Sequence, residues 1–169
     1  NIYIEAGEGA FVDFITLYKI LPKESVLVER ATDIKSNATV NWHDAVDLGG
    51  NAEINTKSNL NGPGASSSSN CIFVMQGGSV LKINDTKCHL AKNTASVIFV
   101  RGVVGGSSKA DVSGLTKIEK NAVGSEANQK FEILSLSENA SINPVPSFEI
   151  KNNDVKCAHS SAAGRVDEE

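Results

Sequence analysis

The sequence predicts an all-β protein, and within that class a parallel β-helix with little or no α-helix. Apolar and polar residues alternate with a period near two through almost every segment, as expected for strands with one buried face. No segment combines a sustained 3.6-residue apolar period with helix caps. Small residues that open a strand also recur at intervals near 14 or 28 residues, which is typical of a chain that coils through stacked turns.

The expected strands follow from this alternation. Residues 10–20 are apolar for long enough to suggest a helix, but their β-branched and aromatic content and the flanking Gly9 and Pro22 favour a strand. The other strands are expected at 1–6, 26–30, 39–43, 45–48, 52–55, 71–75, 80–83, 96–100, 116–118, 131–136, 147–150 and 154–159.

The corners between strands are expected where Asn, Gly or Lys precedes a small residue, because such residues fit sharp bends. The Gly- and Ser-rich stretch 59–70 is expected to be an exposed loop, and it lacks the Lys-Ser/Thr of a phosphate-binding loop. A β-sandwich or jelly roll is the competing all-β fold, but it would more often show two-residue hairpin turns. The strand-opening small residues are Ala10, Ala38, Ala52, Ser79, Ala95, Ala110, Ala122 and Ala140.

Length and charge limit the possible functions. The 169 residues fit a single domain, 1–169, and the net charge of -4 argues against nucleic-acid binding. No apolar run approaches the roughly 20 residues of a membrane span, and no secretory leader precedes the first strand. The chain starts at Asn1 and its single methionine is Met75, so we expect a fragment or a processed product. Three widely spaced cysteines indicate a reducing compartment, hence a cytoplasmic location.

The stretch 146–169 gathers a thiol and an imidazole. In a strand over 154–159, Val155, Cys157 and His159 share one face, whereas residues 154, 156 and 158 take the other. A thiol and an imidazole two residues apart can both reach a soft metal, although they cannot complete a tetrahedral site alone. The alternative is structural: Val155 marks the core face, Cys157 is a small buried residue and His159 a hydrogen-bonded histidine.

Other candidate residues are weaker. Cys88 and His89 are adjacent, so in a regular strand one points into the core and the other outward. His43 is expected at the surface. The chain has no Cys-x-x-Cys pair and no Gly-x-Ser-x-Gly nucleophile motif. Carboxylates that could pair as in a β-helical lyase or glycosidase are Asp44, Asp47, Glu53, Asp111 and Glu119.

The C-terminal stretch DVKCAHSSAAGRVDEE resembles the signature of the SufB/SufD family in its SufD form, Asp-Asp-Val-Lys-Cys-Ser-His-Gly-Ala-Thr-x-Gly followed by Asp-Glu. Ser160 replaces the usual Gly and Ala162 the usual Thr, so the local backbone geometry is in question. Similar family segments recur in order from about residue 45 onward. The matching signature positions are Asp154, Val155, Lys156, Cys157, His159, Gly164, Asp167 and Glu168.

The resemblance implies a right-handed, single-stranded β-helix core whose flanking helical segments are absent from this chain. It implies a noncatalytic scaffold of the Suf (SufBCD) iron–sulfur cluster assembly complex, which carries a cluster or iron transiently and holds no tight cofactor. The implied partners are a SufB-like paralogue or a second copy, docked through the C-terminal strands, and the SufC ATPase, bound through segments outside this chain. Neither nucleic acid nor membrane insertion is implied, and the location is the cytoplasm or the plastid stroma.

The resemblance also assigns the site. Cys157 and His159 are the cluster or metal candidates, and Val155, Cys157 and His159 the dimer-interface candidates. Cys88 and His89 stay weaker candidates, on the ground of the residues alone. Two other functions stay open from the residues alone. One is a β-helical carbohydrate-active enzyme, although aromatic residues make up only 5% of the chain. The other is a structural repeat protein without chemistry of its own.

Overall fold

The computed structural model describes residues 1–165, and this part of the chain consists of strands and corners without helix. No helix capable of crossing a membrane occurs in the described range. The twelve strands are β1 (Ile2–Ala6), β2 (Phe11–Ile20), β3 (Ser25–Ile34), β4 (Thr39–Leu48), β5 (Asn51–Leu60), β6 (Ser66–Met75), β7 (Val80–His89), β8 (Ala95–Val104), β9 (Lys109–Ile118), β10 (Ser125–Ser135), β11 (Ser141–Ile150) and β12 (Val155–Arg165).

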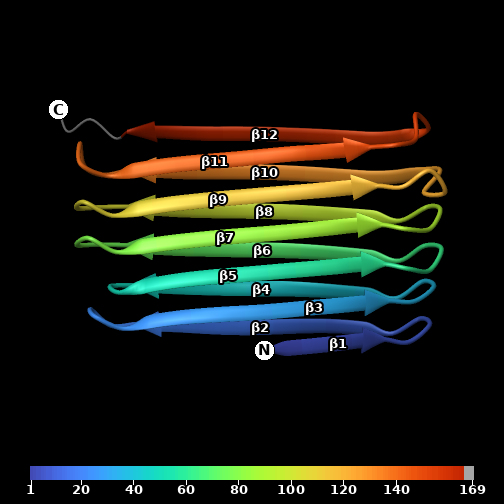
Figure 1. Cartoon of the computed structure of the whole chain (residues 1–169), viewed down its shortest axis with the longest axis horizontal. Coiled ribbons are helices and arrows are strands. Elements are labelled where there is room, and N and C mark those ends of the chain that lie inside the picture. The colour runs from blue at the N-terminus through green and yellow to red at the C-terminus, as the bar shows by residue number, and fades with distance from the viewer. Residues whose placement is uncertain (166–169) are drawn as a thin grey trace.

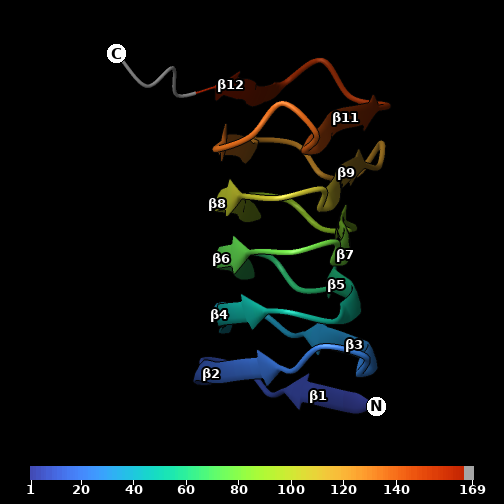
Figure 2. The ribbon, with the colours of Figure 1, turned by 90° about the vertical axis from the view of Figure 1, so that its left-hand side faces the viewer.

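The strands stack into two parallel sheets of six. The odd-numbered strands form one sheet, in the order β1-β3-β5-β7-β9-β11, and the even-numbered strands form the other. Figure 1 shows odd strands running rightward in front and even strands returning leftward behind while the chain climbs, which is a right-handed coil. The side view in Figure 2 shows the two sheets as facing stacks. The predicted parallel β-helix is confirmed, and the sandwich alternative is excluded.

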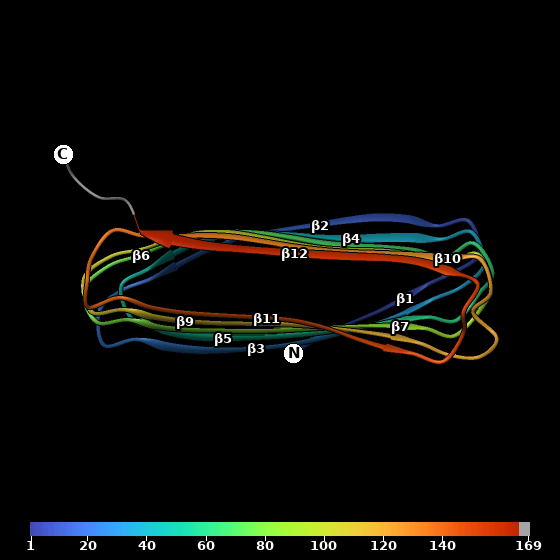
Figure 3. The same cartoon turned by 90° about the horizontal axis from the view of Figure 1, so that it is seen from above.

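One turn of the coil contains two strands and two corners. Paired residues in neighbouring turns differ by 26 positions at the shortest, Ser25 with Asn51, and by 32 at the longest, Lys109 with Ser141. The interval near 14 seen in the sequence is therefore one strand with its corner, and the interval near 28 is one turn. Seen from above in Figure 3, the coil is flattened, so that two long sheets are closed by short corners.

The corners before the even strands β2 to β10 repeat the same conformation. One residue there adopts a positive φ, between 56° and 72°, and its N–H donates to a carbonyl of the next turn over 2.8–3.2 Å. Glycine reaches this region without steric cost, and asparagine tolerates it better than most residues. The repeated Gly/Asn punctuation of the sequence is thus a stack of identical bends. These residues are Gly9, Asn37, Gly64, Asn93 and Gly124.

Inward-facing residues fill the coil differently at its two ends. Where odd strands begin and even strands end, one apolar cluster runs through the turns, with Leu48, Leu81, Val104 and Phe131 among its most buried members. Smaller apolar clusters occupy the opposite end in the first and last turns. Between them, buried polar side chains take the inward positions. Area removed from water at the apolar end is the main stabilising contribution.

The loop predicted at 59–70 is much shorter in the structure. Strand β5 continues to Leu60 and β6 begins at Ser66, which leaves a corner of five residues. Ser67 and Ser69 point inward and are buried, with 1% and 5% of their surface exposed. The low-complexity Gly- and Ser-rich composition suggested an exposed loop. Here Ser67 and Ser69 are held by hydrogen bonds inside the coil, which the composition does not reveal.

Candidate functional site

Strands β11 and β12 form the last described turn, so each pairs with only one neighbour. β11 pairs with β9, and β12 pairs with β10. In β12, Cys157 lies beside Ala127 and His159 beside Gln129, both of which are inward-facing and buried. The predicted shared face of Val155, Cys157 and His159 is therefore the inner face of the coil, at its open end.

The surroundings of the two candidate ligands differ. Cys157 and Val155 are half-buried and pack with Phe148 against the apolar cluster of Ile118 and Ala127. His159 is exposed, and its ring lies 5.4 Å from the Phe148 ring, centroid to centroid. Partial burial raises the pKa of the Cys157 thiol, so at neutral pH it is protonated and must lose its proton to bind a metal.

Within residues 1–165, no three His, Cys, Asp or Glu side chains lie close enough together to hold a metal ion. Cys157 and His159 are two potential ligands of different chemistry, and a metal or cluster bound there would need further ligands from outside the described residues. Asp167 and Glu168 of the C-terminal signature lie outside the described residues. Ser160, whose replacement of Gly raised a question about the backbone, lies within β12 and has no positive φ.

The weaker candidates Cys88 and His89 point to opposite faces of β7, as predicted. His89 faces inward and is fully buried, with Nδ1 2.7 Å from Thr94 Oγ1 and Nε2 2.8 Å from Ser96 Oγ. Both ring nitrogens are therefore engaged, and burial lowers the His89 pKa to about 4, so the ring is neutral. Cys88 faces outward between Asn59 and Lys117, and burial raises the pKa of its thiol. The two side chains do not converge on one ligand.

His43 lies on the outer face of β4, as predicted, half-buried and 3.4 Å from Asp13 Oδ1 through Nε2. The candidate carboxylates do not share a groove. Asp44 faces inward, whereas Asp47 lies on the outer face of the same strand, and the remaining ones belong to the other sheet and its ends.

Sequence reasoning missed a buried ion pair inside the coil. Arg30 of β3 binds the Asp44 carboxylate through both Nη atoms, one at 2.9 Å, and donates from Nε to Thr56 Oγ1 at 2.7 Å. Its guanidinium also lies 4.5 Å above the Trp42 ring centroid. Burial opposes the charged form, but the bonds to Asp44 outweigh it and raise the Arg30 pKa.

A second buried cation, Lys87 of β7, lies two turns above Arg30. Lys87 Nζ donates to Ser58, Ser67 and Ser69 over 2.6–3.3 Å and lies 3.2 Å from Asp85 Oδ1. Burial lowers the Lys87 pKa, and Asp85 opposes that shift. The approach to Asp85 Oδ1 does not have hydrogen-bonding geometry, so this oxygen has no hydrogen-bond donor among the described residues.

Arg30, Asp44 and Asp85 line a small interior cavity of about 10 Å³, room for about one water molecule. Burial raises the pKa of the Cys71 thiol, which lines this cavity, so the thiol is a poor nucleophile there. The alternation of side chains along β7 could have revealed the cluster. Leu81 and Ile83 point inward, and Asp85, Lys87 and His89 follow at the same two-residue spacing. The other lining residues are Arg30, Asp44, Ile54, Thr56, Ser69, Ile83, Asp85 and Val100.

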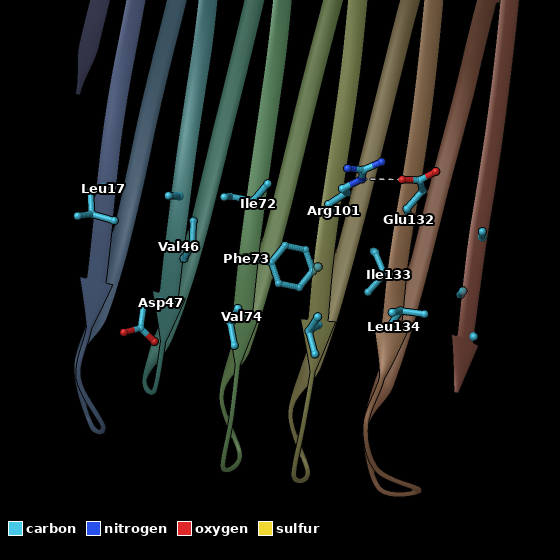
Figure 4. Close-up of a pocket in the computed structure, with 16 residues that line it drawn as sticks. Leu17, Val46, Asp47, Ile72, Phe73, Val74, Arg101, Glu132, Ile133 and Leu134 are labelled. Atoms are coloured by element: carbon cyan, nitrogen blue, oxygen red, sulfur yellow. Dashed lines mark hydrogen bonds and ion pairs between the residues drawn. The ribbon is translucent and has the colours of Figure 1, made fainter. Parts of the chain in front are cut away.

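The outer face of the even-numbered sheet carries an apolar hollow of about 910 Å³ (Figure 4). Exposed Leu17, Ile72 and Leu134 project into it, and a salt bridge of 2.7 Å between Arg101 Nε and Glu132 Oε2 lies across its upper part. The outer face of the odd-numbered sheet instead carries hydrogen-bonded asparagines, such as Asn84 on Asn55 at 2.8 Å.

The fold defines a class: a parallel β-helix whose last described turn carries a thiol and an imidazole on its inner face. Comparison with known families identifies the family. Residues 1–169 match the family model described as "SUF system FeS cluster assembly, SufBD core domain". The chain therefore belongs to the SufBD core domain family, as the C-terminal signature indicated.

Individual relatives carry both family names. The chain is 30% identical over 109 residues to the iron–sulfur cluster assembly protein SufD of Bacillus subtilis, covering 64% of this chain and 25% of the relative. It is 23% identical over 169 residues to SufB of the same organism, covering 99% of this chain and 36% of the relative. A chloroplastic SufBD family protein of Arabidopsis thaliana is 26% identical over 81 residues, 48% of this chain and 14% of the relative. The chain thus spans about a third or less of these proteins.

Proposed function

We propose that this chain is the β-helix core of a SufD-like scaffold in iron–sulfur cluster assembly, and that Cys157 and His159 contribute ligands at a subunit boundary. The observation that carries the proposal is the position of these two residues on the inner face of the last turn, beside an unpaired strand edge. A family match over the whole chain supports the assembly role.

The chemistry fits transient rather than permanent binding. Thiolates hold iron–sulfur clusters strongly, whereas a histidine ligand changes their potential and stability. Two ligands from one chain leave the remaining positions to a partner, so a cluster is completed only in the assembled complex. Because Cys157 must lose a proton whose pKa is raised, cluster or iron uptake should increase as the pH rises.

The partners belong to the same proposal. The second solenoid is a SufB-like paralogue or another copy of this chain, and the energy source is a separate SufC-type ATPase that binds outside residues 1–169. The chain itself acts as a noncatalytic scaffold. Its compartment is the cytoplasm, or the plastid stroma in an organism with plastids.

The test uses the full-length protein purified with its partner and reconstituted anaerobically with iron and sulfide. We expect the visible absorption of the cluster to fall several-fold in the Cys157→Ala/His159→Ala double variant. Cys88→Ala is the matched control, because Cys88 is also a free cysteine with a raised thiol pKa but lies on the outer face of another strand. Unchanged absorption in the double variant, or an equal loss in Cys88→Ala, would contradict the site assignment.

A further inference from the structure

Two columns of inward-facing residues face each other in the middle turns of the coil. On the odd-numbered sheet, Arg30, Thr56 and Asp85 share one register position on β3, β5 and β7. The facing column on the even-numbered sheet consists of Asp44, Cys71 and Val100. The middle turn contributes only the small side chains Thr56 and Cys71, so that the interior cavity of about 10 Å³ remains among these six residues.

Asp85 brings to this cavity a buried acceptor that needs a donor. Its side chain is 4% exposed, and its Oδ1 has no hydrogen-bond donor among residues 1–165. Lys87 Nζ lies 3.2 Å away but is already committed, because an ammonium group has three hydrogens and three serine hydroxyls accept them. A buried carboxylate oxygen without a donor is more costly than an unpaired neutral group, and a buried ion pair stabilises only when its remaining lone pairs are satisfied.

Two hydroxyl groups that line the cavity have a hydrogen to donate into it. Thr56 Oγ1 accepts from Arg30 Nε at 2.7 Å, and Ser69 Oγ accepts from Lys87 Nζ at 2.6 Å. A hydroxyl carries one hydrogen besides its acceptor lone pairs, so each of the two can also donate to a molecule in the cavity. The cavity therefore offers hydroxyl donors on one side and the Asp85 acceptor on the other.

We propose that this cavity binds one water molecule as an integral part of the folded coil. The water accepts a hydrogen bond from a hydroxyl, donates to Asp85 Oδ1 and places its second hydrogen on the Asp44 carboxylate, which also lines the cavity. Buried waters typically make about three such bonds, and the volume is that of about one water. The water thereby joins the Asp85–Lys87 pair to the Arg30–Asp44 pair, so that the two ion pairs form one network across the sheets.

A monovalent cation is the competing ligand, because carboxylate and hydroxyl oxygens line the cavity. The charges argue against it: Arg30 and Lys87 already balance Asp44 and Asp85, and all four side chains are buried. A bound cation would add an uncompensated charge to a site removed from solvent, which is strongly unfavourable. A cavity without a ligand is the other alternative, but dry cavities are lined by apolar groups, whereas polar ones of this size hold water.

The test combines a high-resolution crystal structure, with and without rubidium soaking, and water-oxygen magnetic relaxation dispersion, whose amplitude counts long-lived internal waters in solution. We expect an electron-density peak within hydrogen-bonding distance of Asp85 Oδ1, without anomalous signal from rubidium. In Cys71→Val, a methyl group enters the cavity and the dispersion amplitude should fall by one water. Cys88→Val is the matched control, because it makes the same change on the outer face of β7 and should leave the amplitude unchanged. If Cys71→Val does not fold, Val100→Ile fills the same cavity from the next turn.

Three results would overturn the proposal. A cavity without density shows that Asp85 is satisfied in another way, and a rubidium peak there shows that the ligand is a cation. An amplitude that stays unchanged when the cavity is filled, or that falls equally in Cys88→Val, shows that the long-lived water is not at this site. None of these measurements involves iron, sulfide or a partner protein, so the proposed assembly function is tested separately, by the reconstitution experiment.

Discussion

The two ends of the flattened coil are filled by different kinds of side chain. Where odd strands begin, the inward positions are apolar in turn after turn, and the cluster around Leu48, Leu81 and Phe131 is continuous. Near the other end, the middle turns hold Lys87 and His89 in hydrogen-bonded networks. Apolar stacking is tolerant of which apolar residue is present, whereas each buried polar group depends on a specific partner on another strand or corner.

The largest effect is expected where a buried charge loses its partner. Asp44→Asn leaves the Arg30 guanidinium buried without its counter-charge, and should lower the free energy of unfolding by about 3–5 kcal/mol in urea denaturation. The double variant Arg30→Met/Asp44→Leu removes both charges and should recover most of this loss. A loss below about 1 kcal/mol in Asp44→Asn would show that the pair does not stabilise the polar region.

The next effect depends on pH. The pKa of His89 is depressed to about 4 in the folded state against about 6.5 when unfolded, so the unfolded chain takes up the proton first as the pH falls. Stability from this residue is complete above about pH 6.5 and decreases between pH 6.5 and 4, by roughly 3 kcal/mol in all. Urea titrations at several pH values measure it. The free energy of unfolding of His89→Gln should depend less steeply on pH between 4 and 6.5 than that of the unmodified protein. Identical slopes would show that His89 does not cause this pH dependence.

A slightly smaller loss is expected in the apolar half. Gly102 faces inward, where an added Cβ would overlap the Phe73 ring, so Gly102→Ala should cost about 2 kcal/mol by displacing that ring. Phe73→Leu/Gly102→Ala creates room and should regain part of the loss. Thermal denaturation of the three variants gives the comparison, and a neutral Gly102→Ala would mean that the apolar cluster is looser than its geometry indicates.

The smallest effect should come from the outer face. Arg101 and Glu132 form an exposed ion pair, with 57% and 31% of their side-chain surface accessible, so solvent screens their attraction. Arg101→Ala should change the free energy of unfolding by about 0.5 kcal/mol or less. The same denaturation series measures it. A loss comparable to that of Asp44→Asn would remove the distinction between inner and outer charges.

Much of the fold could be predicted from sequence because it is local and repetitive. Strand alternation and the Gly/Asn corners each act within one turn, so the pattern appears in a single sequence. The Cys157/His159 face was predictable for the same reason, since side chains two residues apart share a side. The prediction of a loop at 59–70 was wrong because Ser67 and Ser69 are held in β6 by hydrogen bonds from Lys87, which is about 20 residues away in the sequence.

By itself, the sequence determined the coil, the positions of most strands, and that Cys157 and His159 face the same way, although it divided β4 in two and placed a loop where β6 begins. Tertiary structure alone decided the partners inside the coil, namely Arg30 with Asp44 of the opposite sheet, and Lys87 with three serines of the turn below. The physical reason is register. Corners of variable length set which residues meet between turns, and a shift of one position would reverse every inward and outward side chain.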